Sequence, residues 1–302
     1  MDVYKKLIRV VFSLILIIDL MYDSIKLLKR RVKMNRKALI IAVLALIAII
    51  SVGSCSAGWF DFITGEPDLD GQEVNLAAAA SLKNVYDNEL IPMFEEKYPG
   101  VKVTPTYASS GDLQTQIENG LEADVFMSAA NKQMNALADE GLVDNDTNLQ
   151  FLENKVVLIV PADSSADISS FDDLKDLDGT IAIGDPESVP AGQYAKEALE
   201  NLGLWDAVQS KLSLGTDVTA VLNQVGQGSA ECGIVYATDA KSTDDVKVVC
   251  EVPDDALDTP VIYPVAQIKD SKNADAAKAF MDFLQTQEAK DKFVEYGFTI
   301  HE

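Results

Sequence analysis

The stretch Thr180–Leu199, TIAIGDPESVPAGQYAKEAL, predicts a strand, a turn and the start of a helix. Its first four residues form an apolar, mostly β-branched run, which is typical of a buried strand. Gly184-Asp185-Pro186 ends that strand, and Pro190 has the fixed φ that suits the first turn of a helix. Apolar residues then recur at helical spacing, at Tyr194, Ala195, Ala198, Leu199 and Leu202. The stretch therefore predicts one strand-to-helix unit of an α/β fold.

The start of this helix is a candidate anion site. The first backbone N–H groups of a helix have no partner inside it and lie at the positive end of the helix dipole. Ala191 and Gly192 carry small or no side chains, so their N–H groups stay accessible. An ordinary strand-to-helix turn has the same features, so the rest of the chain decides between the two interpretations.

Strand and helix patterns alternate through the rest of the chain. Strands are predicted at 74–79, 101–107, 124–127, 156–161, 180–184, 232–236, 246–252 and 261–268. Helical patterns between many of them favour an α/β fold with largely parallel strands. We interpret the long strands 156–161 and 261–268 as two crossovers between lobes. The first lobe is expected to comprise residues 74–156 and 264–302, and the second lobe residues 157–263.

Three of the predicted strand-to-helix junctions are candidate binding positions, because ligands of open α/β sheets bind beyond the carboxyl ends of strands. They are Ser81, Ser110 and Ala191–Gly192. Ser81 is also expected to cap the helix that it begins, and Ser109–Ser110 also suit a simple turn. Because such junctions occur in both lobes, we expect a shared cleft between them.

The charge of the chain limits what it binds. The formal net charge is −23, and residues 55–302 hold 15 Lys/Arg against 45 Asp/Glu, a net charge of −30. A domain this acidic repels nucleic acid, so we expect no nucleic-acid partner. Because no arginine follows Arg36, an anion must be held by neutral N–H and O–H donors rather than by guanidinium groups.

The scarcity of histidine argues against an enzyme. His301 is the sole histidine and is expected to be a solvated terminal residue, so a histidine-based triad or zinc cluster is excluded. A secreted serine hydrolase would also need a G-x-S-x-G turn, which the sequence lacks. Cys232 and Cys250 lie in apolar runs typical of buried free thiols, although a disulfide between them stays open.

The N-terminal region predicts export. Met34–Lys37 is basic, Ala38–Val52 is apolar, and small residues precede Cys55, which together indicate a signal peptide that starts at Met34. The segment before Cys55 resembles the lipobox of bacterial lipoproteins. That resemblance implies cleavage of residues 1–54, lipidation of Cys55 and attachment to the membrane surface. Residues 55–73 are expected to be a flexible tether.

Several segments, in their order along the chain, resemble the extracytoplasmic molybdate-binding proteins of ABC importers. They are AAASL at 78–82, YASSGDL at 107–113, ADVFMSA at 123–129, GDPESVPAGQYAKEAL at 184–199, GIVYATDA at 233–240 and YGFTI at 296–300. The resemblance covers residues 74–302. It implies the two-lobed periplasmic-binding-protein fold of type II, which closes on its ligand like a hinge.

The resemblance also implies a ligand and the residues that hold it. The ligand is molybdate or tungstate, with no cofactor and no metal beyond the bound oxyanion. Its expected donors are the hydroxyls of Ser81, Ser110 and Tyr236 and the backbone N–H groups of Ala191 and Val218. Gly111 departs from the family pattern, in which a third serine is common, and Cys232 also departs. The implied protein is a monomer on the outer face of the cytoplasmic membrane that delivers its ligand to an ABC permease.

Alternatives to this interpretation stay open at the level of the sequence. Sulfate is also a dianion that only accepts hydrogen bonds, so a receptor for sulfate or another small anion fits the same donors. Each site residue also has a purely structural interpretation. Ser81 suits a helix cap, and Tyr236 suits a core tyrosine bonded to the backbone.

Overall fold

The computed structural model describes residues 69–301. The expected signal region 1–54, Cys55 and residues 56–68 of the expected tether lie outside these residues. The folded part begins at Leu69 rather than Val74, because Leu69 is only 4% exposed and the Gly71 N–H donates to the Gly100 carbonyl at 3.2 Å. The end of the expected tether is therefore packed against the protein.

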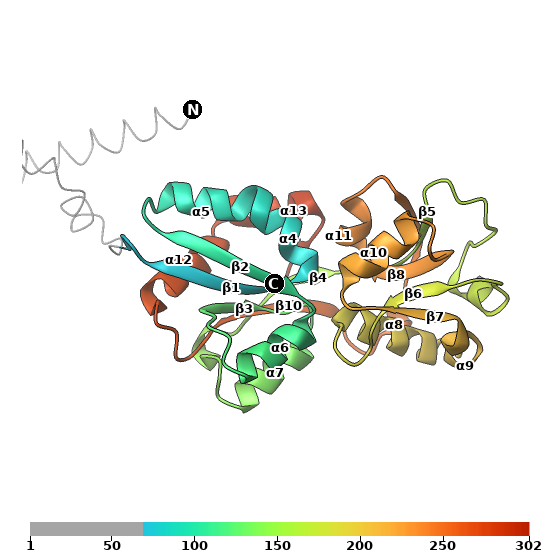
Figure 1. The fold of residues 1–302 in the computed structure, drawn as a ribbon, viewed down its shortest axis with the longest axis horizontal. Coiled ribbons are helices and arrows are strands. Elements are labelled where there is room, and N and C mark those ends of the chain that lie inside the picture. The colour runs from blue at the N-terminus through green and yellow to red at the C-terminus, as the bar shows by residue number, and fades with distance from the viewer. Residues whose placement is uncertain (1–68, 302) are drawn as a thin grey trace, which may run out of the picture. The chain divides into compact units, whose positions relative to one another are not determined.

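Two β-sheets organise the described residues, and we call each sheet with its helices a lobe (Figure 1). The sheet of the first lobe has the strand order β11-β4-β10-β3-β1-β2. Its strands are β1 (Glu73–Ala79), β2 (Lys102–Ala108), β3 (Val125–Met127), β4 (Leu149–Asn154), β10 (Val261–Gln267) and β11 (Thr299–Ile300). Strands β1, β2 and β3 are parallel to one another, whereas β10 runs antiparallel to β3 and β4.

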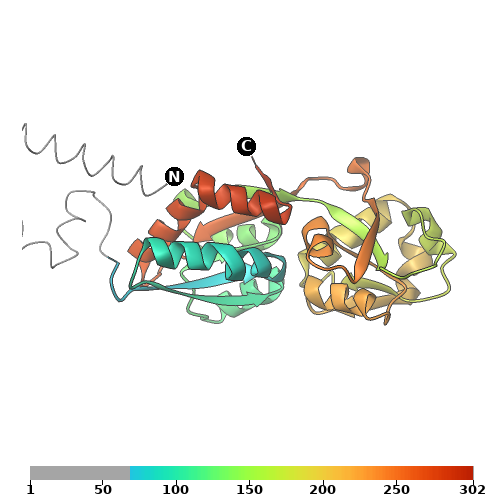
Figure 2. The same cartoon turned by 90° about the horizontal axis from the view of Figure 1, so that it is seen from above.

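Helices cover both faces of the first sheet. A continuous helical run follows β1, and helices at the C-terminus pack beside it (Figure 2). The elements are η1 (Ala80–Leu82), α4 (Lys83–Val85), η2 (Tyr86–Leu90), α5 (Ile91–Lys97), α6 (Ser110–Glu118), α7 (Asn131–Asp139), η3 (Asn145–Thr147), α12 (Ala274–Leu284) and α13 (Gln287–Tyr296). Tyr86, Phe94, Phe280 and Phe293 join these helices in one aromatic cluster. A smaller core around Leu113, Phe126 and Leu137 lies under α6 and α7.

The second lobe repeats this plan with the strand order β7-β6-β8-β5-β9. Strand β6 is parallel to β7 and β8, and β5 is antiparallel to β8 and β9. The strands are β5 (Val156–Pro161), β6 (Ile181–Gly184), β7 (Leu212–Gly215), β8 (Cys232–Tyr236) and β9 (Val246–Glu251). The helices are η4 (Phe171–Lys175), α8 (Pro190–Asn201), α9 (Trp205–Val208), η5 (Gln209–Lys211), α10 (Val218–Gly226) and α11 (Ala237–Lys241).

The chain passes between the lobes twice. The first passage is at Lys155, between β4 and β5, and the second is the segment 252–260 with η6 (Asp254–Ala256). The sequence analysis expected strands β5 and β10 themselves to cross between the lobes. Each of these strands pairs within one sheet, so the chain crosses directly before each strand instead. Strand pairing also places Val156 in the second sheet and Val261–Tyr263 in the first, a small displacement of the expected lobe boundaries.

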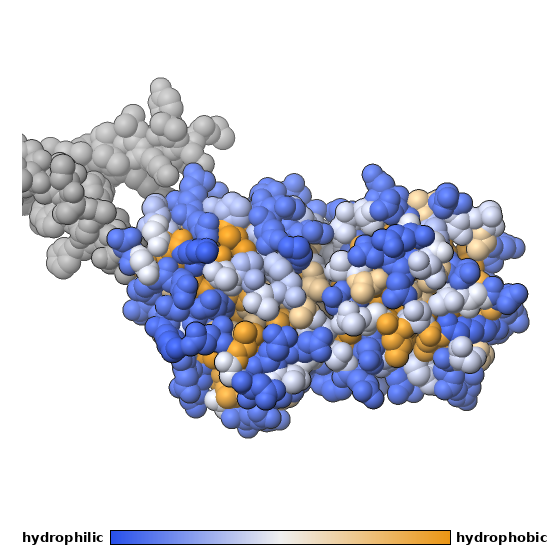
Figure 3. Space-filling view, in the orientation of Figure 1, coloured by the Kyte–Doolittle hydropathy of each residue, from blue (hydrophilic) through white to orange (hydrophobic). Residues whose placement is uncertain are grey.

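The surface is largely hydrophilic on the face shown in Figure 3, and neither cysteine of the described residues forms a disulfide. Cys232 is buried and Cys250 half-buried, and both are free thiols. Burial raises the pKa of the Cys232 thiol to about 12, which makes it unreactive. No helix within residues 69–301 is long and apolar enough to cross a membrane.

Candidate functional site

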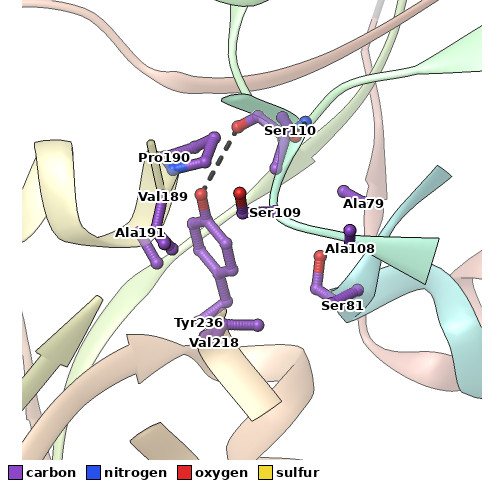
Figure 4. A pocket seen from close by; sticks show the side chains of 12 residues that line it. Ala79, Ser81, Ala108, Ser109, Ser110, Val189, Pro190, Ala191, Val218 and Tyr236 are labelled. Carbon is purple, nitrogen blue, oxygen red and sulfur yellow. Dashed lines mark hydrogen bonds between the residues drawn. The ribbon is translucent and has the colours of Figure 1, made fainter. Parts of the chain in front are cut away.

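All five residues that the sequence singled out line one pocket between the lobes. The lining residues are Ala79, Ala80, Ser81, Ala108, Ser109, Ser110, Ala129, Val189, Pro190, Ala191, Val218 and Tyr236. Figure 4 shows Ser81 and Pro190 on opposite sides of this space, with Tyr236 between them. The empty space is about 210 Å³, part of it open to solvent.

Strand register brings these residues together. In the first lobe Ala79 at the end of β1 pairs with Ala108 at the end of β2, so the turns that carry Ser81 and Ser110 leave the same edge of the sheet. In the second lobe Gly184 at the end of β6 pairs with Gly215 at the end of β7. The turns after these strands lead into α8 and α10, and β8 beside them ends at Tyr236. The pocket therefore lies where the carboxyl ends of parallel strands from both sheets face each other.

The hydroxyl of Ser110 is set as a donor to the pocket. Ser110 is fully buried, and its Oγ accepts a hydrogen bond from the Ala129 N–H at 2.9 Å. A backbone N–H can only donate, so the direction of this bond is fixed. The proton of the Ser110 hydroxyl then remains for another acceptor. Ser109, one residue earlier, also lines the pocket, and its Oγ accepts from the Asp112 N–H and so caps α6.

Ser81 does not cap a helix, contrary to the expectation from the sequence. It lies inside η1, whose cap position is Ala79, and no side chain caps that turn. A tight helical turn begins one residue before the serine, so the Ser81 hydroxyl does not reach the backbone N–H groups of the turn. The Ser81 Oγ instead lies 3.0 Å from the hydroxyl of Tyr263, a residue of β10.

Two helices of the second lobe present backbone N–H groups to the pocket. Helix α8 begins at Pro190 after the cap residue Val189, and α10 begins at Val218 after the cap residue Asp217. The Asp217 carboxylate accepts from the Ala220 N–H, which leaves the Val218 N–H without it. Within residues 69–301 neither the Ala191 N–H nor the Val218 N–H has a hydrogen-bond acceptor. Both groups are therefore free to bind an anion at the positive end of a helix dipole.

Tyr236 contributes the third hydroxyl of the pocket. Its ring is 1% exposed, and its hydroxyl donates to the Ala129 carbonyl across the pocket at 3.4 Å. Burial raises the pKa of Tyr236 well above its usual value, so the phenol keeps its proton at physiological pH. The long bond to Ala129 is weak, and the same proton is available to a ligand placed between them.

A glycine sets the position of α8. A Cβ on Gly192 would lie 2.0 Å from the Gly184 carbonyl oxygen, which no side chain tolerates. The start of the helix therefore approaches the end of β6 as closely as only a glycine allows. This approach holds the Ala191 N–H at the edge of the sheet, beside the pocket.

The two lobes touch across the pocket. The Gly111 N–H of the first lobe donates to the Ser188 carbonyl of the second at 2.9 Å, and a Cβ on Gly111 would lie 2.4 Å from that oxygen. Gln133 Nε2 donates to Gln193 Oε1 at 3.2 Å, also between the lobes. The glycine at position 111, a departure noted in the sequence, thus permits a direct backbone contact between the lobes.

Fixed charges are absent from the lining of the pocket. Tyr236 is the one titratable residue among those that line it. Burial raises the pKa of Asp239, on α11 after Tyr236, to about 7. Within residues 69–301 no group of His, Cys, Asp and Glu is placed to hold a metal ion. His301 is not simply solvated as expected, because its Nδ1 lies 2.6 Å from Glu153 Oε1.

The sequence missed the polar residues behind the pocket. Asn154 ends β4 and Tyr263 lies in β10. Asn154 donates to the Tyr263 hydroxyl, which in turn is hydrogen-bonded to Ser81. Tyr263 interrupts the otherwise apolar run VIYPVA, and a polar group inside a buried strand is the signal that could have identified it.

Comparison with known proteins gives consistent matches over this folded part. Residues 74–299 match the family model described as bacterial extracellular solute-binding protein. A Bacillus subtilis protein named putative ABC transporter substrate-binding lipoprotein YvgL is 36% identical over 86% of this chain and 97% of its own length. The molybdate-binding protein ModA of Haemophilus influenzae is 40% identical over 75% of this chain and 90% of its own.

Solved structures are also similar to this chain. The substrate-binding domain of a putative molybdenum ABC transporter from Clostridium difficile is 42% identical, with a TM-score of 0.60, and the match covers 76% of this chain and all of that one. The periplasmic molybdate-binding protein of Azotobacter vinelandii has a TM-score of 0.68 at 21% identity, over 76% of this chain and all of that one. The latter likeness shows the fold alone, and it confirms the predicted two-lobed α/β architecture.

Proposed function

The chain belongs to the bacterial extracellular solute-binding proteins, and we propose that within this family it is a receptor for molybdate or tungstate. The family consists of binding receptors rather than enzymes, which confirms the prediction of a non-enzymatic protein. The ligand is proposed to lie in the pocket between the lobes, held by the Ser81, Ser110 and Tyr236 hydroxyls and the Ala191 and Val218 N–H groups.

One observation carries this proposal: donors from both lobes converge on a small pocket that has no fixed charge. Tetrahedral oxyanions such as molybdate are dianions near neutral pH and offer only acceptors, so a site built of donors suits them. Hydrogen bonds to a charged acceptor are roughly twice as strong as neutral ones, and they gain further strength in a dry site. These bonds offset the cost of removing water from the dianion without a buried positive charge.

The names of the relatives support the choice of ligand. ModA of Haemophilus influenzae and the Clostridium difficile domain carry molybdate and molybdenum in their names, and both exceed 35% identity to this chain. Tungstate has the same charge and the same tetrahedral shape, so the same donors serve both ions. Sulfate shares the charge and has a smaller radius, and it is therefore the competitor against which selectivity is measured.

Delivery to a membrane permease completes the proposed role. Closure of the two lobes on the ligand gives a permease a means of distinguishing loaded from empty receptor. The name of the Bacillus subtilis relative includes ABC transporter and lipoprotein, which supports a permease partner and a lipid on Cys55. Cys55 lies outside the described residues, and mass spectrometry of membrane-extracted protein tests its modification directly.

Calorimetric titration of the purified protein tests the proposed ligand. We expect one-to-one binding of molybdate and of tungstate, weaker binding of sulfate, and little response to phosphate. Equal affinity for sulfate would contradict the choice of ligand while leaving the donor pocket in place. No binding of any of these ions to folded protein would contradict the proposal as a whole.

A further inference from the structure

The hydroxyl of Ser81 belongs to a chain of buried hydrogen bonds that ends at the passage between the lobes. We propose that Tyr263, oriented by Asn154, is a positioning and specificity residue that holds the Ser81 hydroxyl as a donor to the oxyanion. The inference rests on the proposed function, since it assigns a role toward the ligand of the same pocket. Neither residue lines the pocket; the Tyr263 hydroxyl reaches it through Ser81, and the Tyr263 ring packs edge-to-face against Tyr236.

This series of hydrogen bonds starts at the backbone of Lys155, which fixes the side-chain amide of Asn154. The Lys155 N–H donates to Asn154 Oδ1 at 2.8 Å. Because a backbone N–H cannot accept, the carbonyl side of the amide must face it. The amide nitrogen then faces the other way, where it lies 2.9 Å from Thr238 Oγ1 and 3.2 Å from the Tyr263 hydroxyl.

The orientation of Asn154 in turn sets the Tyr263 hydroxyl. An amide NH₂ group only donates, so Tyr263 accepts from Asn154. The phenol has one proton of its own, and Ser81 Oγ lies 3.0 Å from it. Tyr263 is fully buried, and burial raises its pKa well above the usual value, so the phenol stays protonated. The geometry allows either hydroxyl of this pair to donate, and we assign Tyr263 as the donor because the Asn154 amide already donates to its oxygen.

The consequence for Ser81 is a fixed direction of its own hydrogen bond. An oxygen that accepts from Tyr263 has its proton free for a second partner, and Ser81 lines the pocket. The hydroxyl proton of Ser110 is also free, because its oxygen accepts from the Ala129 N–H. Ser81 and Ser110 are thus both set to donate to the pocket, Ser110 by a backbone group and Ser81 by Tyr263.

This series of hydrogen bonds joins residues beside both passages between the lobes. Asn154 ends β4 directly before the first passage, Thr238 is on α11 of the second lobe, and Tyr263 is in β10 after the second passage. Asn154 and Thr238 are each 7% exposed. The bond between them is therefore a buried contact between the lobes, and it supports the amide orientation that the Lys155 N–H sets. The hydrogen bonds that orient Ser81 therefore include one that joins the two lobes.

A fixed donor discriminates against ligands that carry a proton. Hydrogen phosphate and dihydrogen phosphate need an acceptor for each P–O–H group, and a buried unpaired donor is costly. Without Tyr263, the Ser81 hydroxyl can rotate and accept such a proton. The Tyr263 hydroxyl is therefore expected to widen the preference for molybdate over phosphate, and to leave the preference over sulfate unchanged because sulfate has no proton.

The test is a double-mutant cycle with Tyr263→Phe and Ser81→Ala, measured by calorimetry with molybdate. Tyr263→Phe is expected to weaken binding about five- to tenfold, the value of one hydrogen bond, and Ser81→Ala by at least as much. The double variant is expected to bind no more weakly than Ser81→Ala alone, because Tyr263→Phe keeps the ring contact with Tyr236 and removes only the hydroxyl that holds Ser81. The ratio of phosphate to molybdate dissociation constants is expected to fall severalfold in Tyr263→Phe, with the sulfate ratio unchanged.

Tyr86→Phe is the matched control. Tyr86 is a fully buried tyrosine of the same lobe, and its hydroxyl donates to Met127 Sδ at 2.9 Å, away from the pocket. The Tyr86→Phe variant is expected to lose stability as Tyr263→Phe does. Its affinity for molybdate and its ratio of phosphate to molybdate dissociation constants are expected to stay unchanged. Thermal unfolding of every variant confirms that folded protein is compared.

The outcomes separate the inference from the proposed function. Additive losses in the cycle, or equal affinity of Tyr263→Phe and the parent chain, would overturn the role of Tyr263 while the receptor stands. Failure of the parent chain to bind molybdate would overturn the proposed function, and with it the premise of the inference. A phosphate ratio that falls equally in Tyr86→Phe would show a general loosening of the lobe and would also overturn the specificity role.

Discussion

Ser110 Oγ accepts a hydrogen bond from the Ala129 N–H at 2.9 Å, and this bond decides what the serine does in the pocket. The backbone donor occupies the oxygen, so the hydroxyl proton is left for a ligand. Ser128, which is equally buried, differs in one respect. Its Oγ accepts from the Ala130 N–H at 3.1 Å but returns its proton to the Ala130 carbonyl at 2.7 Å.

Ser110→Ala is therefore expected to weaken molybdate binding by about 1–3 kcal/mol, the value of a hydrogen bond to a charged acceptor. The substitution also leaves the Ala129 N–H without its acceptor, so some stability is lost as well. Ser128→Ala loses an equivalent backbone acceptor but no pocket donor, and is expected to keep its affinity. Calorimetry on both variants checks this, and equal dissociation constants for the two would contradict the role of Ser110.

A backbone donor can be removed at Val218 without breaking the helix. Val218 is the first residue of α10, a position where proline is favoured, and the cap residue Asp217 already has the extended backbone that precedes a proline. Val218→Pro is expected to weaken oxyanion binding by about 1–3 kcal/mol, because the N–H is lost. Val218→Ala keeps the N–H and is the control. Circular dichroism verifies the helix, and equal affinities of the two variants would argue against a backbone donor here.

The contact between Gln133 and Gln193 is expected to slow ligand release. Gln133 Nε2 donates to Gln193 Oε1 between the lobes, so the bond exists only while the lobes touch. Gln193→Ala is expected to raise the dissociation rate of molybdate about two- to tenfold, since one net hydrogen bond contributes about 0.5–1.5 kcal/mol. Stopped-flow measurements test this. Gln114→Ala, at an exposed pair with Glu118 on α6, should leave the rate as it is.

Asp239 gives the protein a pH-dependent stability. Burial, with a further contribution from the charge of Asp217, raises the pKa of Asp239 from 3.8 to about 7. Between pH 4 and pH 7 the folded protein holds a proton that the unfolded chain has lost. Stability from this group is therefore greatest below about pH 4, falls as the pH rises to 7, and stays low above it.

Asp239→Asn removes this titration. The free energy of unfolding of the parent chain relative to the variant is expected to fall on the order of 2–4 kcal/mol between pH 4 and pH 7. Denaturant unfolding across this range measures it. The comparison cancels the contributions of the many other carboxyl groups, and parallel profiles would mean that Asp239 titrates normally.

The sequence was sufficient for elements whose pattern is local. The run of apolar residues before Gly184 and the proline at position 190 predicted β6 and α8 closely, because strand burial and helix starts leave a signal within a few residues. Strands β4 (LQFLEN), β7 (LSLG) and β11 (TI) were missed. They are short or mix polar with apolar residues, and their position depends on pairing with distant strands.

The site likewise has features that local sequence predicts and features that depend on distant residues. The Ala191 N–H follows from where α8 begins, which local sequence marks, whereas the Val218 N–H and the Tyr236 hydroxyl were expected only from the family resemblance. The contact of Ser81 with Tyr263 joins residues that are 182 positions apart, so no local pattern reveals it. The expected cap at Ser81 was wrong because the first turn is η1, which begins at Ala80.

The position of the bound ion shows whether the pocket between the lobes is the binding site. Crystals of the protein grown with molybdate, measured at the molybdenum absorption edge, reveal the ion by its anomalous scattering. We expect a single strong peak in the pocket, within hydrogen-bond distance of the Ser81, Ser110 and Tyr236 hydroxyls and the Ala191 and Val218 N–H groups. A peak elsewhere, or an empty pocket at a molybdate concentration that saturates binding in solution, would contradict this expectation.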